Sequence, residues 1–154
     1  MAQPDSSLVE DALIAKLLND GQLAAMLPDG WWWDIAGLGK DGKNAKRFGI
    51  LSLVDHSDTA VFGGRAWEDY LFLVKGVVLM SSGGNIKGAA ARIDAILDPL
   101  PPEAPATLSI EGYGLMAVFR ERRIRATEVD ETDPTIRWLH RGGHYRVQVT
   151  PNEA

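Results

Sequence analysis

Apolar residues recur at helical spacing in three stretches of the chain. Residues 7–18 show this spacing behind a capping-box pattern, Ser7 followed by Glu10, which marks a helix start. A shorter helix is expected over 22–27, because Pro28 ends it. The clearest stripe precedes Pro99 and predicts a helix with one apolar face. That face comprises Ile86, Ala89, Ala90, Ile93, Ile96 and Leu97.

Short runs rich in apolar and β-branched residues alternate with these helices. Residues 48–54 and 67–80 are typical of two strands, and the polar, glycine-bearing segment 55–65 is expected to join them as a hairpin loop. Residues 115–125 and 145–149 predict two further strands, the last with a regular alternation of apolar and polar side chains. This pattern indicates an α+β fold: an antiparallel or mixed sheet of about four main strands, with helices packed on one face, in the order α-α-β-β-α-β-β.

Composition adds limits on what the chain does. Its 154 residues, 45% hydrophobic and 24% charged, fit a single domain over 1–154. The absence of cysteine excludes a disulfide framework, a thiolate nucleophile and a cysteine-based zinc site. The longest apolar run, 70–80, contains Lys75 and is too short to span a membrane. Acidic residues stand where a signal peptide needs a basic leader, so we expect synthesis in the cytoplasm without cleavage. A net charge of −5 predicts no affinity for random DNA at physiological salt.

Two glycine-rich loops resemble phosphate-binding motifs in part. Residues 37–44, GLGKDGKN, match a P-loop except at Asn44, where Ser or Thr is needed, and a strand instead of a helix follows. We therefore expect a solvated loop, and its Lys40 and Lys43 are candidates for partner contact. Residues 81–88, SSGGNIKG, do lead from a strand into a helix, whose N-terminus attracts anions. Their composition also suits an ordinary capped turn, so both interpretations stay open.

The histidines indicate no reaction centre. His140 and His144 have the spacing of a helical zinc site, but two glycines separate them in a segment predicted to be a strand. His56 and Asp58, with a serine between them, contain the residue types of a hydrolytic triad, yet neighbours on a loop do not orient one another as a triad requires. We assign no catalytic residue, no metal and no cofactor, and expect the protein not to be an enzyme.

Two segments are candidates for protein contacts. Trp31, Trp32 and Trp33 cannot all face one core in a strand or helix, so at least one should be exposed or buried against another molecule. The run RERRIR, residues 120–125, is either an edge strand guarded by charge or one half of a charge-complementary subunit contact. Strand alternation would place Arg120, Arg122 and Ile124 on one face. It would place Glu121, Arg123 and Arg125 on the other.

Over most of its length, the chain resembles the tail terminator proteins of long-tailed bacteriophages, also called tail completion or head–tail joining proteins. The resemblance lies in the layout: an N-terminal helix, the break LPDG, a loop before the first hairpin, then IKGAAARIDAIL, LMAVFRERRIR and RWLHRGGHYRVQV. It is strongest in the ending, an arginine followed by GG-x-Y-x-V-x-V.

This resemblance implies a structural virion protein that needs no active site. Family membership would imply a ring, a hexamer in the family, that caps the tail tube, ends its polymerisation and forms the surface to which the head joins. Its partners would be further copies of itself, the tail tube protein and a head–tail connector, with DNA passing through without specific binding. The alternatives are a head-side connector, another tail-assembly factor, or a small ligand-binding domain that uses residues 81–88.

Overall fold

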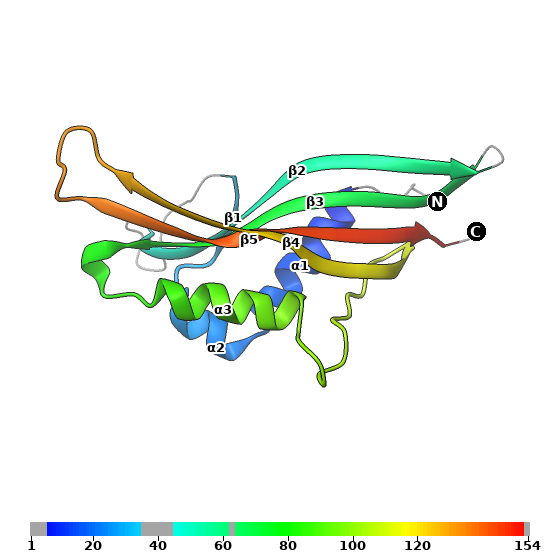
Figure 1. The fold of residues 1–154 in the computed structure, drawn as a ribbon, viewed down its shortest axis with the longest axis horizontal. Coiled ribbons are helices and arrows are strands. Elements are labelled where there is room, and N and C mark those ends of the chain that lie inside the picture. Colours follow the sequence, from blue (N-terminus) through cyan, green and yellow to red (C-terminus); the bar gives the residue numbers. More distant parts are fainter. Residues whose placement is uncertain (1–5, 35–44, 62–63, 153–154) are drawn as a thin grey trace.

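A five-stranded mixed sheet, in the order β1-β2-β3-β5-β4, runs the length of the molecule (Figure 1). The computed structural model describes residues 6–34, 45–61 and 64–152. Its elements in chain order are α1 (Ser6–Leu18), α2 (Gly21–Met26), β1 (Trp31–Trp33), β2 (Arg47–Val61), β3 (Gly64–Leu79), the 3-10 turn η1 (Met80–Ser82), α3 (Ile86–Leu97), β4 (Tyr113–Val129) and β5 (Arg137–Pro151). The predicted α+β class is confirmed, and all three helices lie against the same face of the sheet (Figure 1).

The main core lies between these helices and the sheet. Leu13 of α1 and Ile93 of α3 are fully buried against Phe72 and Val74 of β3 and Val147 of β5. Each fully buried side chain of this kind contributes about 1.5–3 kcal/mol, so this layer carries most of the stability of the fold. Among the described residues, no helix is both long and apolar enough to cross a membrane.

The hairpin between β2 and β3 is much longer than expected. Residues 55–61 do not form a loop, because β2 stays paired with β3 as far as Val61, which faces Gly64. The prediction was wrong because this part of β2 is exposed on both faces and therefore lacks the apolar alternation that marks a half-buried strand. The β2–β3 hairpin projects at one end of the sheet and the β4–β5 hairpin at the other (Figure 1).

The tryptophan segment also differs from the prediction, which placed no strand there. Trp31–Trp33 forms β1, a short strand that pairs in parallel with residues 49–51 of β2 and makes the sheet mixed. Gly49 makes room for it, since a Cβ at this position would lie within 2.5 Å of the Trp31 ring. Asp29 holds the start of β1 against β2, because its carboxylate accepts hydrogen bonds from the backbone N–H groups of Lys46 (2.9 Å) and Arg47 (3.0 Å). Three residues are too few for periodicity to reveal a strand.

A β-bulge in β4 decides which way its arginines point. Arg120 faces Tyr145 of β5 and Arg122 faces His144, so the pairing register shifts at Glu121. A bulge adds one unpaired residue and changes the face of every side chain after it. The alternation expected from the sequence is therefore wrong: Arg123 joins Arg120 on the helix side of the sheet, while Arg122 lies on the opposite side.

Candidate interaction surfaces

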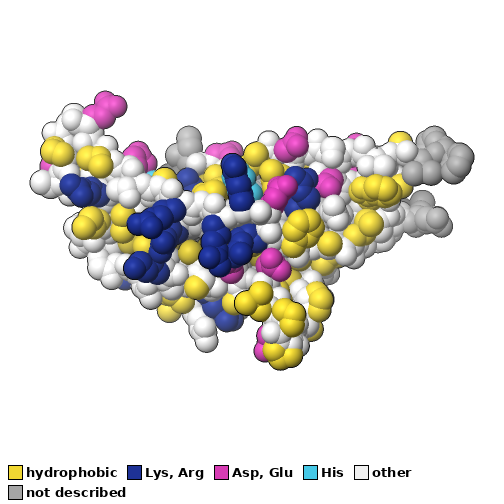
Figure 2. Space-filling view, in the orientation of Figure 1, with side chains coloured by type: hydrophobic (Ala, Val, Ile, Leu, Met, Phe, Trp, Pro, Cys, Tyr) yellow, Lys and Arg dark blue, Asp and Glu magenta, His cyan; other side chains and the backbone are white. Residues whose placement is uncertain are grey.

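A broad groove of about 1440 Å³ lies between α3, residues 99–107 and the β4–β5 hairpin. We call it the arginine groove, because guanidinium groups from two neighbouring strands line it. Lys and Arg side chains gather on this face, below the projecting β4–β5 hairpin (Figure 2). Pockets for small ligands hold about 300–1,000 Å³ and enclose their ligand, so an open groove of this size suits a segment of a macromolecule better. Five arginines line it: Arg92 of α3, which forms an ion pair with Asp20, and Arg120, Arg123, Arg125 and Arg141 of the two strands.

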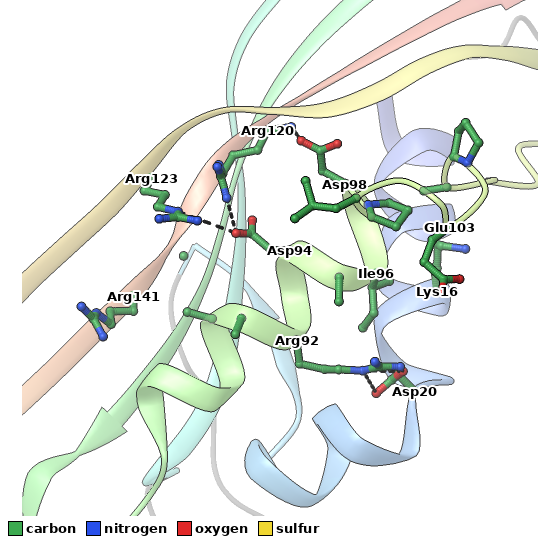
Figure 3. A pocket seen from close by; sticks show the side chains of 18 of the residues that line it. Lys16, Asp20, Arg92, Asp94, Ile96, Asp98, Glu103, Arg120, Arg123 and Arg141 are labelled. Atoms are coloured by element: carbon green, nitrogen blue, oxygen red, sulfur yellow. Dashed lines mark hydrogen bonds and ion pairs between the residues drawn. The ribbon is translucent and has the colours of Figure 1, made fainter.

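Asp94 of α3 organises one end of this groove (Figure 3). Its carboxylate forms an ion pair with Arg120 and accepts a hydrogen bond from the hydroxyl of Tyr145. Arg123 also approaches it, with 3.8 Å between Nε and Oδ2, but the Arg123 side chain stays 76% exposed. Burial, together with the hydrogen bond to Asp94, raises the pKa of Tyr145 far above its ordinary value. The hydroxyl therefore stays protonated and fixes Asp94 beneath the arginines.

Two other arginines of the groove face each other directly. Arg125 of β4 and Arg141 of β5 are cross-strand partners on the helix side of the sheet. Like charges at directly opposite positions of an antiparallel pair destabilise it, because the two Cβ atoms lie only about 5 Å apart. In the described part of the chain, neither guanidinium forms an ion pair with an acidic side chain.

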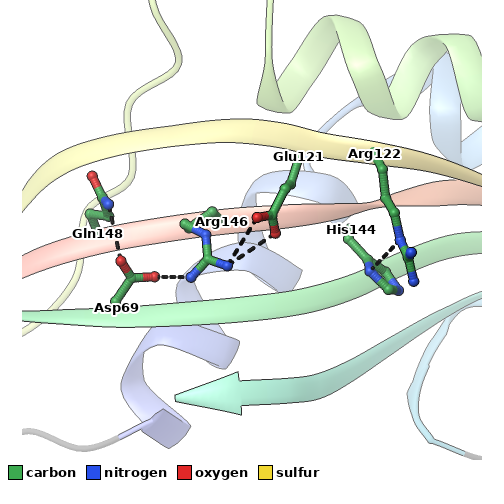
Figure 4. Close-up of polar contacts among 6 residues, drawn as sticks. All are labelled: Asp69, Glu121, Arg122, His144, Arg146 and Gln148. Atoms are coloured by element: carbon green, nitrogen blue, oxygen red, sulfur yellow. Dashed lines mark hydrogen bonds and ion pairs between the residues drawn. The ribbon is translucent and has the colours of Figure 1, made fainter. Parts of the chain in front are cut away.

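The opposite face of the sheet carries a separate polar network (Figure 4). Arg146 of β5 forms ion pairs with Asp69 of β3 and with Glu121 of β4, the latter at 3.0 Å from Nη2 to Oε2. Asp69 also accepts from the side chain of Gln148 at 3.0 Å, and Arg122 Nε donates to His144 Nδ1 at 3.2 Å. These contacts join three strands, and the charge of Arg146 is balanced by Asp69 and Glu121 within the chain. This network therefore has a structural explanation.

The three tryptophans of β1 have three different environments. Trp31 packs against the main core, and Trp32 joins a second apolar cluster that includes Phe48 and Trp138. Trp32 Nε1 donates to the carbonyl oxygen of Asp29 at 3.2 Å. Trp33 is 51% exposed, which confirms that at least one of the three is not buried in the monomer. Trp31 and Trp32 are half-buried, so Trp33 is the most exposed of the three candidates for contact with a partner.

The turn over residues 81–88 uses its polar groups to end η1 and begin α3. Asn85 caps the helix, with its Oδ1 accepting from Gly88 N at 2.9 Å. Ser82 Oγ donates to the carbonyl of Leu79 at 2.6 Å, and the Arg47 guanidinium donates to Ser82. This geometry favours the capped turn over an anion site. The P-loop-like segment 37–44, with Lys40 and Lys43, lies outside the described residues.

The histidines His140 and His144 lie about 13 Å apart along β5, because a strand rises about 3.3 Å per residue, and cannot share one metal ion. His140 bonds Glu128 at 3.1 Å, while burial and the charge of Lys75 lower the pKa of His140.

A different set of residues could hold a divalent cation. His56 Nε2 lies 2.7 Å from Asp58 Oδ1, and one ligand atom from each of His56, Asp58 and the fully buried Glu68 lies within 4.8 Å of the others. The sequence did not indicate this cluster, because β2 was expected to end before it. His56 also stacks on the ring of Tyr70, with 4.4 Å between the centroids. Burial raises the pKa of Tyr70 to about 12, so Tyr70 is neutral at physiological pH.

Of the five groove arginines, sequence reasoning named Arg120, Arg123 and Arg125 as contact candidates and did not name Arg92 or Arg141. It grouped Arg122 with Arg120, whereas the bulge places Arg122 in the other network. A signal for Arg141 was present: residues 130–134, DETDP, have the composition of a turn. A hairpin centred there pairs Arg125 with Arg141.

No protein-family model and no curated protein matches this sequence. The fold is similar to that of a chain in a solved structure described as the virion of a native gene transfer agent particle, with a TM-score of 0.62 and 19% sequence identity. The match covers 94% of this chain and 96% of that chain. The likeness at this identity establishes a shared fold over nearly the full length of both chains.

Proposed function

We propose that the protein is a structural component of a phage-like virion, and that it acts there as a tail terminator. In this role a ring of subunits, a hexamer in the resembled family, caps the tail tube, stops its polymerisation and provides the surface to which the head joins. The observation that carries the proposal is the fold shared, over nearly the full length of both chains, with a chain of a gene transfer agent virion. The sequence layout described above points to the same class.

The surfaces of the subunit suit a closed ring. A ring is built from contacts between unlike patches, so each subunit must present two different surfaces to its neighbours. The sheet has β4 along one side, two hairpins projecting at opposite ends, and an open groove lined by arginines. The excess of acidic residues over the whole chain suits a channel through which DNA moves without binding, because phosphate binding depends on Lys and Arg.

The neighbour's description covers a whole particle, so a head-side connector or another tail-assembly factor would fit the same likeness. Binding to isolated tail tubes and to isolated heads separates these roles. The ligand-binding alternative is weaker, since residues 81–88 are occupied with capping. A bulky residue at Gly84, within this turn, would not test the alternative cleanly, because it would also disturb the packing there. A Cβ at Gly84 would lie 2.6 Å from Cγ1 of Val78.

The deciding experiment measures tube length. Tube protein from the same particle is polymerised with and without this protein, and tubes are measured in negative-stain images. A terminator yields shorter tubes with a ring at one end, in proportion to the amount added. Unchanged tube lengths, with no protein on tube ends, would reject the terminator role. Binding of the protein to heads alone would favour the connector instead.

A further inference from the structure

The arginine groove lacks anions where two of its arginines meet. Arg125 and Arg141 oppose each other across β4 and β5, an arrangement that weakens the strand pair. Asp94 is a carboxylate that forms ion pairs with groove arginines. It is shared between Arg120, Arg123 and the hydroxyl of Tyr145. A surface that keeps uncompensated positive charge at a cost in stability is typical of a site where a partner supplies the negative charge.

The tip of the same hairpin carries that negative charge. Asp130, Glu131 and Asp133 lie in the turn between β4 and β5; we call these three residues the acidic tip. Side-chain hydrogen bonds brace the turn, because Asp130 Oδ1 accepts from the backbone N–H of Thr132 and of Asp133, both at 2.9 Å. The tip stands clear of the body of the molecule, with acidic atoms at its extremity (Figures 1 and 2). A braced, projecting tip loses little entropy on docking.

The acidic tip cannot neutralise the groove of its own chain. Five residues of extended strand separate Arg125 from Asp130, about 17 Å at the rise of a β-strand. An ion pair needs about 4 Å between nitrogen and oxygen, and solvent screens charges beyond about 10 Å. The tip also points away from α3 (Figure 1), which forms one wall of the groove. Tip and groove can therefore meet only between two molecules.

We propose that the acidic tip of one subunit docks in the arginine groove of a second copy of this chain, beside Arg125 and Arg141. The contact joins unlike surfaces, so it leaves one free tip and one free groove at the ends of any open assembly. Such contacts propagate until a ring closes. This inference names the partner surface within the ring of the proposed function, and in that sense it rests on that function.

Complementary variants test the contact. The groove variant carries Arg125→Glu and Arg141→Glu. The tip variant carries Glu131→Lys, because Asp130 and Asp133 hold the turn together. The control carries the single charge reversal Arg122→Glu, which lies in β4 on the opposite face, and it is compared with the single groove variant Arg125→Glu as well as with the double one. Native mass spectrometry and sedimentation velocity, over a concentration series at low salt, measure assembly.

The wild-type protein should assemble, and each variant should assemble about tenfold or more weakly, while the control stays within about twofold of wild type. A mixture of the two variants should form heterodimers and nothing larger. The groove variant then supplies the intact tip, and the tip variant supplies the intact groove. Circular dichroism checks folding, and Arg125→Gln with Arg141→Gln replaces the groove variant if charge reversal prevents folding.

Assembly of both variants with wild-type affinity would overturn the inference, as would a wild-type protein that stays monomeric at low salt. Neither result touches the terminator role, because a ring can close through other surfaces or only on the tube. Conversely, a protein that forms tip-dependent rings but leaves tube length unchanged would keep the contact and reject the terminator.

Discussion

Replacement of Gly142 by alanine should be among the most damaging small substitutions in this protein. Gly142 lies in β5, the strand between β3 and β4, and faces Lys75 of β3. A Cβ at this position would lie 2.5 Å from the Cα of Lys75, and closer still to the carbonyl oxygen of Val74. Both atoms belong to the backbone, so no side-chain rotation relieves the overlap.

The geometry sets the size of the effect. Ordinary van der Waals contact begins near 3.4 Å, so β5 and β3 must separate by about 1 Å at this point. Overpacking of this kind costs about 1–3 kcal/mol, and each ladder hydrogen bond lost in the separation costs about 1 kcal/mol more. We expect the free energy of unfolding to fall by about 3 kcal/mol or more. With a denaturant dependence of about 2 kcal/mol/M, the urea midpoint should fall by about 1.5 M.

Equilibrium unfolding in urea, followed by circular dichroism, measures this change. Gly143→Ala should lose less stability, because its Cβ would lie 2.8 Å from the Arg122 carbonyl oxygen. Gly21→Ala serves as the control. No atom lies within 4 Å of a Cβ at that position, so its stability should be unchanged or slightly higher. A loss at Gly142 below about 1 kcal/mol, or no larger than at Gly21, would refute the argument from close strand approach.

Three further predictions concern charge. Asp20→Asn removes the ion pair with Arg92 and should cost about 1 kcal/mol at pH 7 in urea unfolding. That hydrogen-bonded pair lowers the pKa of Asp20, so the loss should shrink as the pH falls below the ordinary value of 3.8. Arg125→Glu replaces the like-charge pair with Arg141 by an attractive pair. The free energy of unfolding of the dilute monomer should rise by about 0.5 kcal/mol. A lower melting temperature than that of the wild-type protein would contradict this prediction. The pKa of His140 is lowered in the folded state, so this histidine stabilises the fold fully above pH 6.5 and loses that contribution as the pH falls through the folded-state pKa. The melting temperature of His140→Gln should therefore change less between about pH 7.5 and 5 than that of the wild-type protein.

The elements that could be predicted from the sequence are those in which apolar residues recur at a regular spacing. Helix α3 was predicted almost to the residue because its stripe faces a single core. The distal half of β2 was missed because an edge strand exposed on both faces has no apolar pattern to detect. The packing of Trp31 on Gly49 and the close backbone approach at Gly142 depend on contacts between strands. Those contacts cannot be predicted until the pairing register of the strands is known.

The β4 bulge explains why the arginine run serves two purposes. If Glu121 were paired with β5 instead of forming a bulge, strict alternation would place Arg123 and Arg125 on the face of the internal polar network, away from Arg120. The bulge instead places Glu121 and Arg122 in that network, where Glu121 pairs with Arg146 and Arg122 donates to His144. It directs Arg123 and Arg125 to the groove, and Arg125 forms no ion pair with an acidic side chain of the described chain. Bulges re-aim side chains near functional sites. Deletion of Glu121 should therefore remove the bulge yet keep Arg123 and Arg125 on the groove face, because Arg122 then follows Arg120 directly and still pairs with His144. Sedimentation velocity should show that groove-dependent assembly persists in this deletion variant.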